Sequence, residues 1–334
     1  MKAYEIISDG GIDALNLAER PTPTPGHNEV LVRMRASSLN YRDLMTVVDA
    51  GSRNLPYPRI PNSDGAGEVL AVGDGVTRFA AGDRVAGCFF QRWEDGDITA
   101  DGMASALGGA LDGVLAEEVV LSERGLVRIP DHLSFAEAAT LPCAALTAWN
   151  ALVEKGQLIA GETVLLIGTG GVSIFGLQIA AMFGARSIIL SSSDEKLERA
   201  KAMGASDTIN YRSTPDWQDA VVKLTAGRGV DHVVEVGGAG TLPRSIASTR
   251  VAGHVALIGV LTGGEINPTA IMRNSLNFNG IYVGSQAMFE RMNRAFAIAE
   301  LRPVVDRTFA FGQAREAFHH LQAAGHFGKV VVEI

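Results

Sequence analysis

The stretch Thr163-Val-Leu-Leu-Ile-Gly-Thr-Gly-Gly-Val-Ser-Ile-Phe-Gly176 decides the fold of this chain. Its apolar run, Val164 to Ile167, predicts a buried parallel strand. A glycine turn follows at once, and the apolar pattern from Val172 to Phe183 predicts a helix. A strand, a glycine turn and a helix in this order place free backbone N–H groups and a helix N-terminus against a pyrophosphate. We therefore expect a dinucleotide site built on Gly168, Gly170, Gly171 and Val172.

One position departs from the dinucleotide fingerprint. Ser173 stands where the third glycine normally allows a helix and a strand to approach closely. Serine is small enough to be tolerated there, and Gly176 lies one turn further on. A second predicted strand, Ser187 to Leu190, follows in the required context. The alternative is a glycine-rich turn of an α/β protein that binds nothing.

Length and composition restrict the class of protein. The 334 residues suffice for two domains, and 47% hydrophobic with 20% charged residues is typical of a soluble globular chain. The formal charge of −8 disfavours binding to nucleic acid or to an anionic membrane surface. We find no apolar targeting core at the N-terminus and no apolar run of membrane-spanning length. Two cysteines cannot form a disulfide framework, so we expect a reduced, cytoplasmic setting.

The first 125 residues or so are expected to be rich in short strands. The segment from Val30 to Ala36 alternates apolar and polar residues, and Gly82-Asp83 is a turn signal before another strand. Short strands with frequent turns favour a compact barrel. Gln91 to Val114 has little periodicity, so we interpret it either as a flap beside the substrate site or as a disordered surface excursion.

The rest of the chain changes character. Ser134 and Glu137 fit a helix capping box, Pro142 is expected to interrupt, and Ala144 to Val153 should continue as a second helix. From Thr163 to about Val283 strands and helices alternate, which predicts a parallel sheet with crossover helices. The further predicted strands are 208–210, 232–236, 254–258, 278–283 and 329–334, and the helices are 195–203, 217–224, 242–248, 287–299 and 312–324.

Several ordered motifs together resemble the medium-chain dehydrogenase/reductase superfamily. They include Ile60-Pro-Asn-Ser-Asp-Gly-Ala-Gly-Glu-Val69, Ala80-Ala-Gly-Asp-Arg-Val85, Leu141-Pro-Cys-Ala-Ala-Leu-Thr-Ala-Trp149 and Gly328-Lys-Val-Val331. The resemblance implies an α/β protein with a GroES-like β-barrel catalytic domain, residues 1–144 plus 284–334. It also implies a Rossmann domain with a doubly wound parallel sheet, residues 145–283, and an active site in the cleft between the two.

The same resemblance shows where zinc ligands would be expected in this chain. The zinc alcohol dehydrogenases of the superfamily place ligands where this chain has Asn40, Ser63-Asp64 and Cys143, and their structural zinc needs four closely spaced cysteines. One cysteine and one carboxylate are too few ligands for a zinc site. We therefore expect no metal, and we interpret Cys143 as a small buried hydrophobic residue.

The choice of nicotinamide cofactor depends on the end of the second strand. NAD specificity usually rests on an acidic residue there, and this chain has Ser191, which leaves room for a 2′-phosphate. In similar NADPH-dependent reductases a Lys and a Tyr at this spacing hold the phosphate, which here would be Lys196 and Tyr211. Asp194 and Glu195 act against this by repelling phosphate. We favour NADP over NAD.

The nicotinamide end should lie deeper in the site. In the family it is held by the loop after the fourth strand and by two later strand ends, where glycines permit close backbone approach. A residue of the inter-domain helix is also expected on the nicotinamide side. The corresponding residues here are Thr147, Gly237, Ile258, Gly259, Val283, Gly284 and Ser285.

Without zinc, hydrogen-bond donors must stabilise the negative charge that develops on oxygen. Asn40 would hold a carbonyl oxygen, and Tyr41 would donate a proton or merely pack as an aromatic residue. Asp64 is a proton relay or an anchor for Arg42, and Asp43 pairs structurally with an arginine.

Reduction of a quinone, enone or reactive carbonyl needs only hydride and modest polarisation, so we favour it. The alternatives are an alcohol dehydrogenase acting on alcohol or aldehyde, and a non-catalytic dinucleotide-binding sensor. An apolar strand at 278–283 at the edge of the sheet would support a homodimer.

Overall fold

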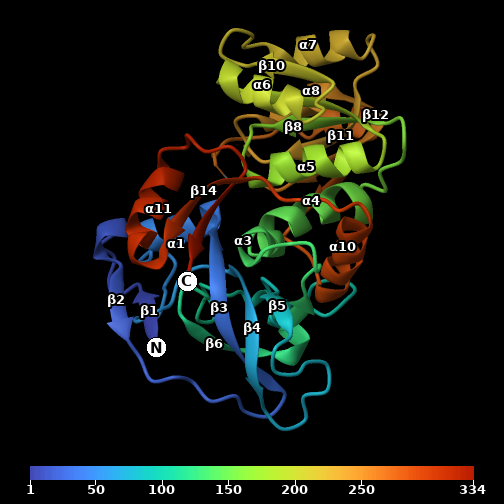
Figure 1. The fold of residues 1–334 in the computed structure, drawn as a ribbon. Coiled ribbons are helices and arrows are strands. Elements are labelled where there is room, and N and C mark those ends of the chain that lie inside the picture. Colours follow the sequence, from blue (N-terminus) through green and yellow to red (C-terminus); the bar gives the residue numbers. More distant parts are fainter. Residues whose placement is uncertain (260) are drawn as a thin grey trace. The chain divides into compact units, whose positions relative to one another are not determined.

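The computed structural model describes residues 1–259 and 261–334. The chain divides into two compact units, one of Met1–Leu146 with Val283–Ile334 and one of Thr147–Tyr282 (Figure 1). The sequence prediction divided the chain after residues 144 and 283. In the structure, the C-terminal segment Val283–Ile334 belongs to the same unit as the N-terminus.

The second unit, Thr147–Tyr282, is built on a parallel sheet. Its strands pair in parallel throughout, in the order β10-β9-β8-β11-β12-β13. Numbered along this unit, that order is 3-2-1-4-5-6, the order of a Rossmann sheet, with its switch point between β8 and β11. The strands are β8 (Thr163–Ile167), β9 (Arg186–Ser191), β10 (Asp207–Asn210), β11 (Val230–Glu235), β12 (Thr249–Leu257) and β13 (Asn277–Gly280). The predicted doubly wound fold is confirmed.

Helices cover both faces of this sheet, which explains why β8 is apolar at consecutive positions. Leu165 belongs to a core cluster with Trp217 of α7 and Leu242 of α8, whereas the side chain of Leu166 lies against Gly176 of α5. Successive strand residues point to opposite faces, so both faces need apolar side chains. The helices are α4 (Leu146–Trp149), a π-helical turn (Asn150–Glu154), α5 (Gly171–Met182), α6 (Asp194–Ala202), α7 (Trp217–Leu224), α8 (Leu242–Ser248) and α9 (Thr269–Arg273).

The departure at Ser173 has a local explanation. The Ser173 hydroxyl is buried and donates a hydrogen bond of 2.7 Å to the carbonyl oxygen of Ile167. A Cβ atom on Gly176 would lie only 2.7 Å from the Leu166 side chain. The close approach of helix and strand therefore falls at Gly176, and the serine hydroxyl is satisfied where it stands.

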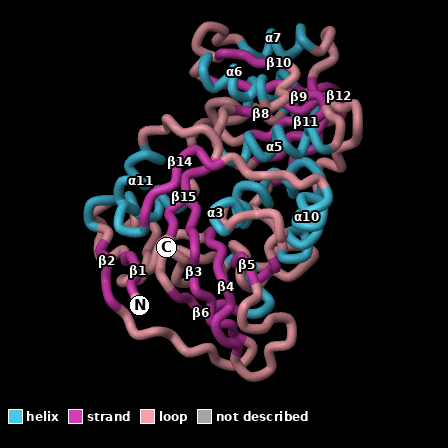
Figure 2. The backbone as a smooth tube through the Cα atoms, viewed as in Figure 1, coloured by secondary structure: helices cyan, strands magenta, loops and turns pink. Residues whose placement is uncertain are grey.

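The first unit is organised around the long strand β3 (Glu29–Leu39), whose pairing is antiparallel with β4, β6 and β15. Figure 2 shows these strands in magenta. The register pairs Val330 with Leu39, so the start of β15 lies beside the end of β3. The other strands are β1 (Lys2–Glu5), β2 (Asn16–Glu19), β4 (Asp64–Val72), β5 (Arg84–Gly87), β6 (Glu118–Ser122), β7 (Leu126–Arg128), β14 (Val305–Ala310) and β15 (Lys329–Glu333).

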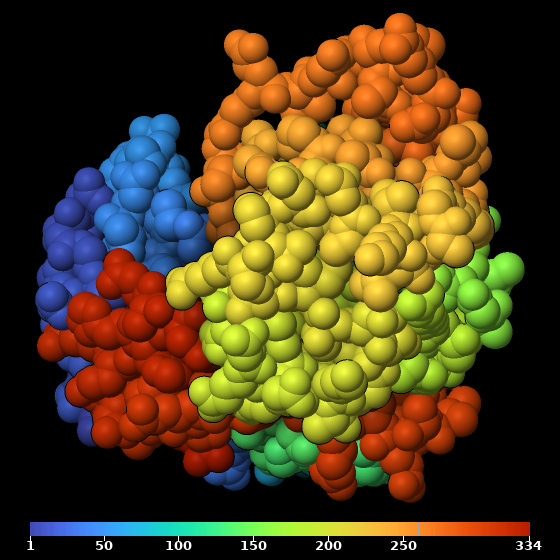
Figure 3. Space-filling view, turned by 90° about the horizontal axis from the view of Figure 1, so that it is seen from above, coloured from blue at the N-terminus to red at the C-terminus, as the bar shows by residue number. Residues whose placement is uncertain are grey.

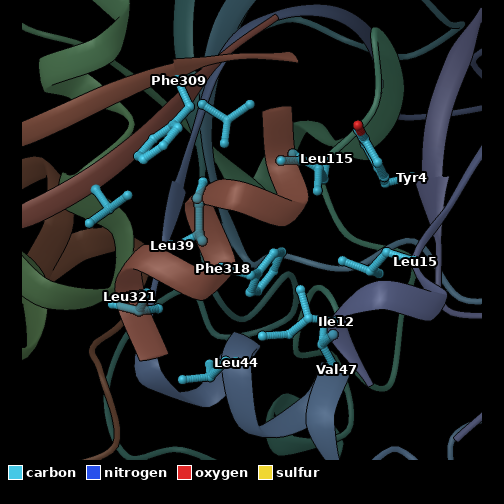
Figure 4. Packing of buried hydrophobic residues seen from close by; sticks show 14 of the residues in the cluster. Tyr4, Ile12, Leu15, Leu39, Leu44, Val47, Leu115, Phe309, Phe318 and Leu321 are labelled. Atoms are coloured by element: carbon cyan, nitrogen blue, oxygen red, sulfur yellow. The ribbon is translucent and has the colours of Figure 1, made fainter. Parts of the chain in front are cut away.

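A buried apolar cluster fixes the end of β3 in place. Leu39, Leu44, Phe318 and Val330 belong to it, and Figure 4 shows Phe318 of α11 among side chains of the N-terminal segments. Burial of such side chains stabilises the fold by roughly 1.5–3 kcal/mol each. The helices of this unit are α1 (Tyr41–Val48), α2 (Ala100–Met103), α3 (Phe135–Ala138), a π-helical turn (Leu141–Ala145), α10 (Gln286–Ile298) and α11 (Ala314–Gln322). Short 3₁₀ turns span Ile12–Ala14, Glu123–Gly125 and Phe311–Gln313.

Three expectations need correction. Pro142 does not interrupt the helical segment, because it lies in the first turn of the π-helical stretch, where its missing N–H costs no hydrogen bond. The predicted strand 278–283 is shorter, β13 ending at Gly280. The stretch 91–114 is not a disordered excursion, because Trp93, Leu107 and Val114 are buried.

The capping box of Ser134 and Glu137 is confirmed by reciprocal hydrogen bonds. Within the part of the chain that is described, no helix combines the length and the apolar character needed to cross a bilayer.

Candidate functional site

A buried polar cluster lies in the first unit at the end of β3. We call it the Asn40 cluster and define it as Asn40, Ser63, Asp64 and Lys329. Asn40 caps α1, Ser63 and Asp64 stand at the start of β4, and Lys329 opens β15. All of these residues are buried, with Ser63 and Asp64 fully so and Lys329 only 3% exposed. Buried polar groups of this kind require partners.

The hydrogen bonds of the Asn40 cluster form a directed chain. The Lys329 ammonium donates to the Asn40 Oδ1 atom at 2.5 Å and to the carbonyl oxygen of Leu39 at 2.7 Å. The Asn40 Nδ2 group donates to Ser63 Oγ at 3.3 Å, and the Ser63 hydroxyl donates to Asp64 Oδ1 at 2.7 Å. The backbone N–H of Cys143 donates to Asp64 Oδ2 at 3.0 Å. The hydrogen bonds therefore run in one direction, from the Lys329 ammonium through Asn40 and Ser63 to the Asp64 carboxylate.

The pKa of the Asp64 carboxyl is raised toward neutrality. Burial raises the pKa of its carboxyl to about 6, whereas the Lys329 ammonium and hydrogen bonds from Asn40 and Ser63 act to lower it, and Asp43 acts to raise it. A carboxyl group with this pKa can both hold and release a proton at physiological pH. The arrangement suits the proton relay that the sequence predicted as one of two roles for Asp64.

The other role predicted for Asp64 is wrong. The guanidinium of Arg42 donates to Asp43 Oδ1 at 3.0 Å and to the carbonyl oxygen of Leu107 at 2.7 Å. Asp43, not Asp64, therefore pairs with this arginine, as the separate prediction for Asp43 stated. Asp43 also accepts from the backbone N–H of Asn40 at 2.9 Å and so fixes the start of α1.

Tyr41 stands apart from the Asn40 cluster. Its side chain is 47% exposed at the first position of α1, and its hydroxyl forms no hydrogen bond with the residues the structure describes. The structure therefore brings Asn40 and Asp64 into one network and leaves Tyr41 outside it.

The donor set of this cluster does not fit zinc. Zinc needs thiolate, imidazole or carboxylate ligands that converge on one point. Here Asn40 Oδ1 is occupied by an ammonium, and burial raises the pKa of the Cys143 thiol and so disfavours its thiolate. An ammonium and a neutral thiol beside one carboxylate are the wrong chemistry for a divalent cation.

The glycine turn in the second unit is open toward a ligand. Gly168 has a φ of +76°, which favours glycine. Gly170 has an ordinary φ of −76°, and a Cβ atom there would meet no atom of the described residues within 4 Å. Neither the backbone nor the packing requires glycine at 170, so the position suits close approach of a bound group. No side chain among the described residues caps the N-terminus of α5, and uncapped N–H groups at a helix N-terminus suit an anion such as a pyrophosphate.

The residues predicted near the adenosine ribose lie together at the ends of β9 and β10. The backbone N–H of Tyr211 donates to the carbonyl oxygen of Ser191 at 3.0 Å. Ser193 caps α6, whose first turn carries Lys196. Asp194 accepts a hydrogen bond from Asn210, which draws this carboxylate toward β10. Ser191, the last residue of β9, thus offers a hydroxyl where an NAD-specific site would offer a carboxylate.

A fully buried carboxylate that the sequence reasoning missed shapes the next loop. Glu235 ends β11 and accepts hydrogen bonds from the N–H groups of Gly237 at 2.7 Å and Gly238 at 3.1 Å. It also accepts from the hydroxyls of Thr241 at 2.6 Å and Ser245. Ile258 and Gly259 donate to its carbonyl oxygen. Glu235 therefore joins the two strand ends on which Gly237, Ile258 and Gly259 stand.

The remaining predicted cofactor residues have local roles of their own. Ser285 caps α10 by accepting from the N–H of Met288, and a Cβ atom on Gly284 would lie 2.8 Å from Leu146. Val283 has a φ of +59°, a strained value for a β-branched residue. Thr147 is buried in α4. Their approach to a nicotinamide remains a prediction.

Two further members of the Asn40 cluster were absent from the predicted site. The sequence did contain a signal for Lys329, because a charged residue directly precedes the apolar run of a buried closing strand, Val330 to Val332. No pattern in the sequence, however, connects residue 329 with residue 40. Ser63 lies within a quoted motif, and its importance follows only from its contacts with Asn40 and Asp64.

Family comparisons agree with this architecture. Residues 26–131 match the alcohol dehydrogenase GroES-like domain, and residues 171–297 match the family described as zinc-binding dehydrogenase. A zinc-type alcohol dehydrogenase-like protein of Schizosaccharomyces pombe is 44% identical over 97% of this chain and 96% of its own length. The chain belongs to the medium-chain dehydrogenase/reductase superfamily. Its activity is of the oxidoreductase type shared by alcohol dehydrogenases and quinone oxidoreductases.

Other similar proteins have names that differ in substrate and cofactor. Human quinone oxidoreductase is 26% identical over 99% of this chain and 97% of its own. A solved putative alcohol dehydrogenase from Sinorhizobium meliloti has a TM-score of 0.92 and 44% identity, covering 99% of this chain and 98% of that one. A solved NAD-dependent alcohol dehydrogenase has a TM-score of 0.91 and 36% identity, with full coverage of both chains. A mycobacterial structure complexed with NADPH has a TM-score of 0.84 and 26% identity, also with full coverage.

Proposed function

We propose that this protein is a zinc-independent, NADPH-dependent reductase that transfers hydride to a quinone, an enone or a reactive carbonyl. The Asn40 cluster carries the proposal, because it places a hydrogen-bond donor chain and a titratable carboxyl where a metal-dependent enzyme needs ligands. For a quinone, one hydride from NADPH and one proton give the hydroquinone and NADP⁺. The relative named quinone oxidoreductase supports this substrate class.

The proposed roles follow from the contacts. Asn40 donates to the acceptor's oxygen, and Asp64, with a pKa of about 6, supplies the proton through Ser63. Tyr41 is retained as an alternative proton donor because the residue is 47% exposed. Alcohol oxidation is the second candidate function, favoured by the solved alcohol dehydrogenases that this chain resembles. It would require a base able to accept an alcohol proton, and the carboxylate form of Asp64 is the candidate.

Cofactor choice is the first test. A fluorescence titration of metal-free protein should give tighter binding of NADPH than of NADH. Ser191→Asp should weaken NADPH binding by about tenfold or more, about 1.4 kcal/mol, because a carboxylate would repel the 2′-phosphate, and it should improve NADH binding. Stronger binding of NADH by the unaltered protein would contradict the proposal.

Two lysines on the same helix provide a matched control. Lys196→Gln should weaken NADPH binding selectively, whereas Lys201→Gln, at an exposed position near the end of α6, should leave both affinities unchanged. Equal effects of the two substitutions would mean that only the general charge of the helix matters. If neither dinucleotide binds, the proposed reductase function fails, and so does the alternative of a non-catalytic dinucleotide-binding sensor.

We also propose that the protein is cytoplasmic and binds neither nucleic acid nor membrane. We propose further that it forms a homodimer in which the edge strand β13 of one chain pairs with a second chain. The segment around β13 exposes Val251, Met272 and Tyr282, and the orange atoms of this part of the chain lie at the surface in Figure 3. Exposed apolar side chains beside an open strand edge favour pairing with a second chain. Light scattering should give twice the 35.2 kDa of one chain, and a monodisperse monomer would refute the dimer.

A further inference from the structure

Lys329 is an unusual residue of the first unit, because lysine is almost never fully buried unless it is paired. Its side chain is 3% exposed, yet its ammonium has no carboxylate within ion-pair distance among the described residues. It donates instead to two neutral oxygens, those of Leu39 and Asn40. Burying an ammonium on neutral partners is costly, so its retention needs a reason.

The register of the sheet explains how the lysine reaches this place. Val330 pairs with Leu39, so Lys329 lies beside Asn40, at the point where β3 ends and α1 begins. The apolar cluster that contains Leu39 and Val330 holds both strands. The lysine is thus delivered to Asn40 by an extended, well-packed framework rather than by a mobile surface arm.

The ammonium determines which way the Asn40 amide faces. An ammonium can only donate, so the group it contacts must be the amide oxygen. The Nδ2 group is then forced to the opposite side, where one of its N–H bonds reaches Ser63 Oγ. The same NH₂ group also acts on the Asp64 carboxyl as a hydrogen-bond donor and lowers its pKa, so the donor side of the Asn40 amide faces Ser63 and Asp64.

The ammonium also acts on the charge of the cluster. The charged groups facing this site are Lys329 from β15, Arg42 and Asp43 from α1, and Asp64 from β4. Arg42 and Asp43 form an ion pair at 3.0 Å and largely offset each other. Lys329 and Asp64 are left as the opposite ends of the hydrogen-bonded chain, and the cation favours the ionised carboxylate.

We propose that Lys329 is a positioning residue of this active site: it fixes the Asn40 amide with its NH₂ group toward Ser63 and Asp64, and it is the fixed positive charge that favours negative charge on the acceptor's oxygen. This inference rests on the proposed hydride transfer. It assigns to a buried ammonium the electrostatic part that a metal ion performs in metal-dependent relatives. Fixed charges in a site that excludes water stabilise a developing oxyanion without reorganisation.

The test separates this inference from the proposed function. Asp64 is titrated by NMR of its carboxyl carbon in the unaltered protein, in Lys329→Met, in Lys329→Gln and in Lys2→Met, which removes an exposed lysine of the same unit. The pKa of Asp64 should rise by about one pH unit or more in both Lys329 variants and stay unchanged in Lys2→Met. An unchanged titration in Lys329→Met overturns the inference.

Kinetics supply the second readout. Single-turnover reduction of 9,10-phenanthrenequinone by NADPH should slow by on the order of tenfold to a hundredfold in Lys329→Met, with the affinity for NADPH unchanged. Lys329→Gln keeps an N–H donor without the charge and should be intermediate. Equal rates in all variants overturn the inference. If the unaltered protein reduces no quinone, the proposed function fails, and the Asp64 titration still decides what Lys329 does.

A measurement on the unaltered protein covers the case in which the variants do not fold. The ¹⁵N signal of the Lys329 side chain should be that of an ammonium at pH 7, with protons that exchange slowly because they are buried and hydrogen-bonded. A neutral amine at pH 7, or rapid exchange, would overturn the inference without any substitution.

Discussion

Replacing Glu235 with alanine should lower the free energy of unfolding of the second unit by about 3 kcal/mol or more. The carboxylate accepts from the N–H groups of Gly237 and Gly238 and from the hydroxyls of Thr241 and Ser245, and it is fully buried. Each buried donor left without a partner costs about 1–3 kcal/mol. Urea unfolding followed by tryptophan fluorescence measures the loss, and a dinucleotide titration measures what becomes of the loop.

Glutamine at the same position is the matched control. The amide oxygen of Glu235→Gln can still accept from the Gly237 and Gly238 N–H groups, and its NH₂ group can donate to the Ser245 hydroxyl, which would then accept. The loss should be less than half that of Glu235→Ala. Hydrogen exchange of the Gly237 and Gly238 amides should accelerate strongly only in the alanine variant. Protection equal to that of the unaltered protein in both variants would show that the loop is held by other contacts.

The parts of this fold that were predictable are those encoded over short distances. The apolar run of β8 and the periodic helix α7 could be identified because each carries its own pattern, and the alternation of strands and helices predicted a parallel sheet with crossover helices. The errors also have local causes. Pro142 was expected to break a helix, but a proline in the first turn disturbs no hydrogen bond.

Only those parts of the candidate site that lie within one continuous segment of the chain could be predicted. The glycine turn could be found because strand, turn and helix are consecutive in the chain. The partnership of Lys329 with Asn40 joins residues 289 positions apart and depends on the register of β15 against β3. Glu235 was overlooked because a glutamate at a strand end is usually solvated, and its burial depends on hydroxyls of the following helix. Such long-range contacts follow from the complete fold.

Gly259→Ala should be the second highly disruptive substitution. Gly259 follows Ile258 at the end of β12, and a Cβ atom there would lie 2.0 Å from the carbonyl carbon and oxygen of Val236. These are backbone atoms of the residue that follows β11, so no side chain can rotate away, and the two strand ends must separate. Overpacking costs typically 1–3 kcal/mol, and a clash with backbone should reach about 3 kcal/mol. Dinucleotide affinity should fall as well if Gly237 and Gly259 hold the nicotinamide.

Gly263→Ala separates a steric cause from a general effect of adding a methyl group. A Cβ atom at 263 would meet no described atom within 4 Å, and its backbone is not in the left-handed region. Its stability should stay within about 0.5 kcal/mol of the unaltered protein. Thermal unfolding with and without NADPH compares the two variants directly. If Gly259→Ala unfolds at the same temperature as Gly263→Ala, the ends of β11 and β12 are free to move apart, and the close contact at Gly259 cannot be what holds the loop for the cofactor.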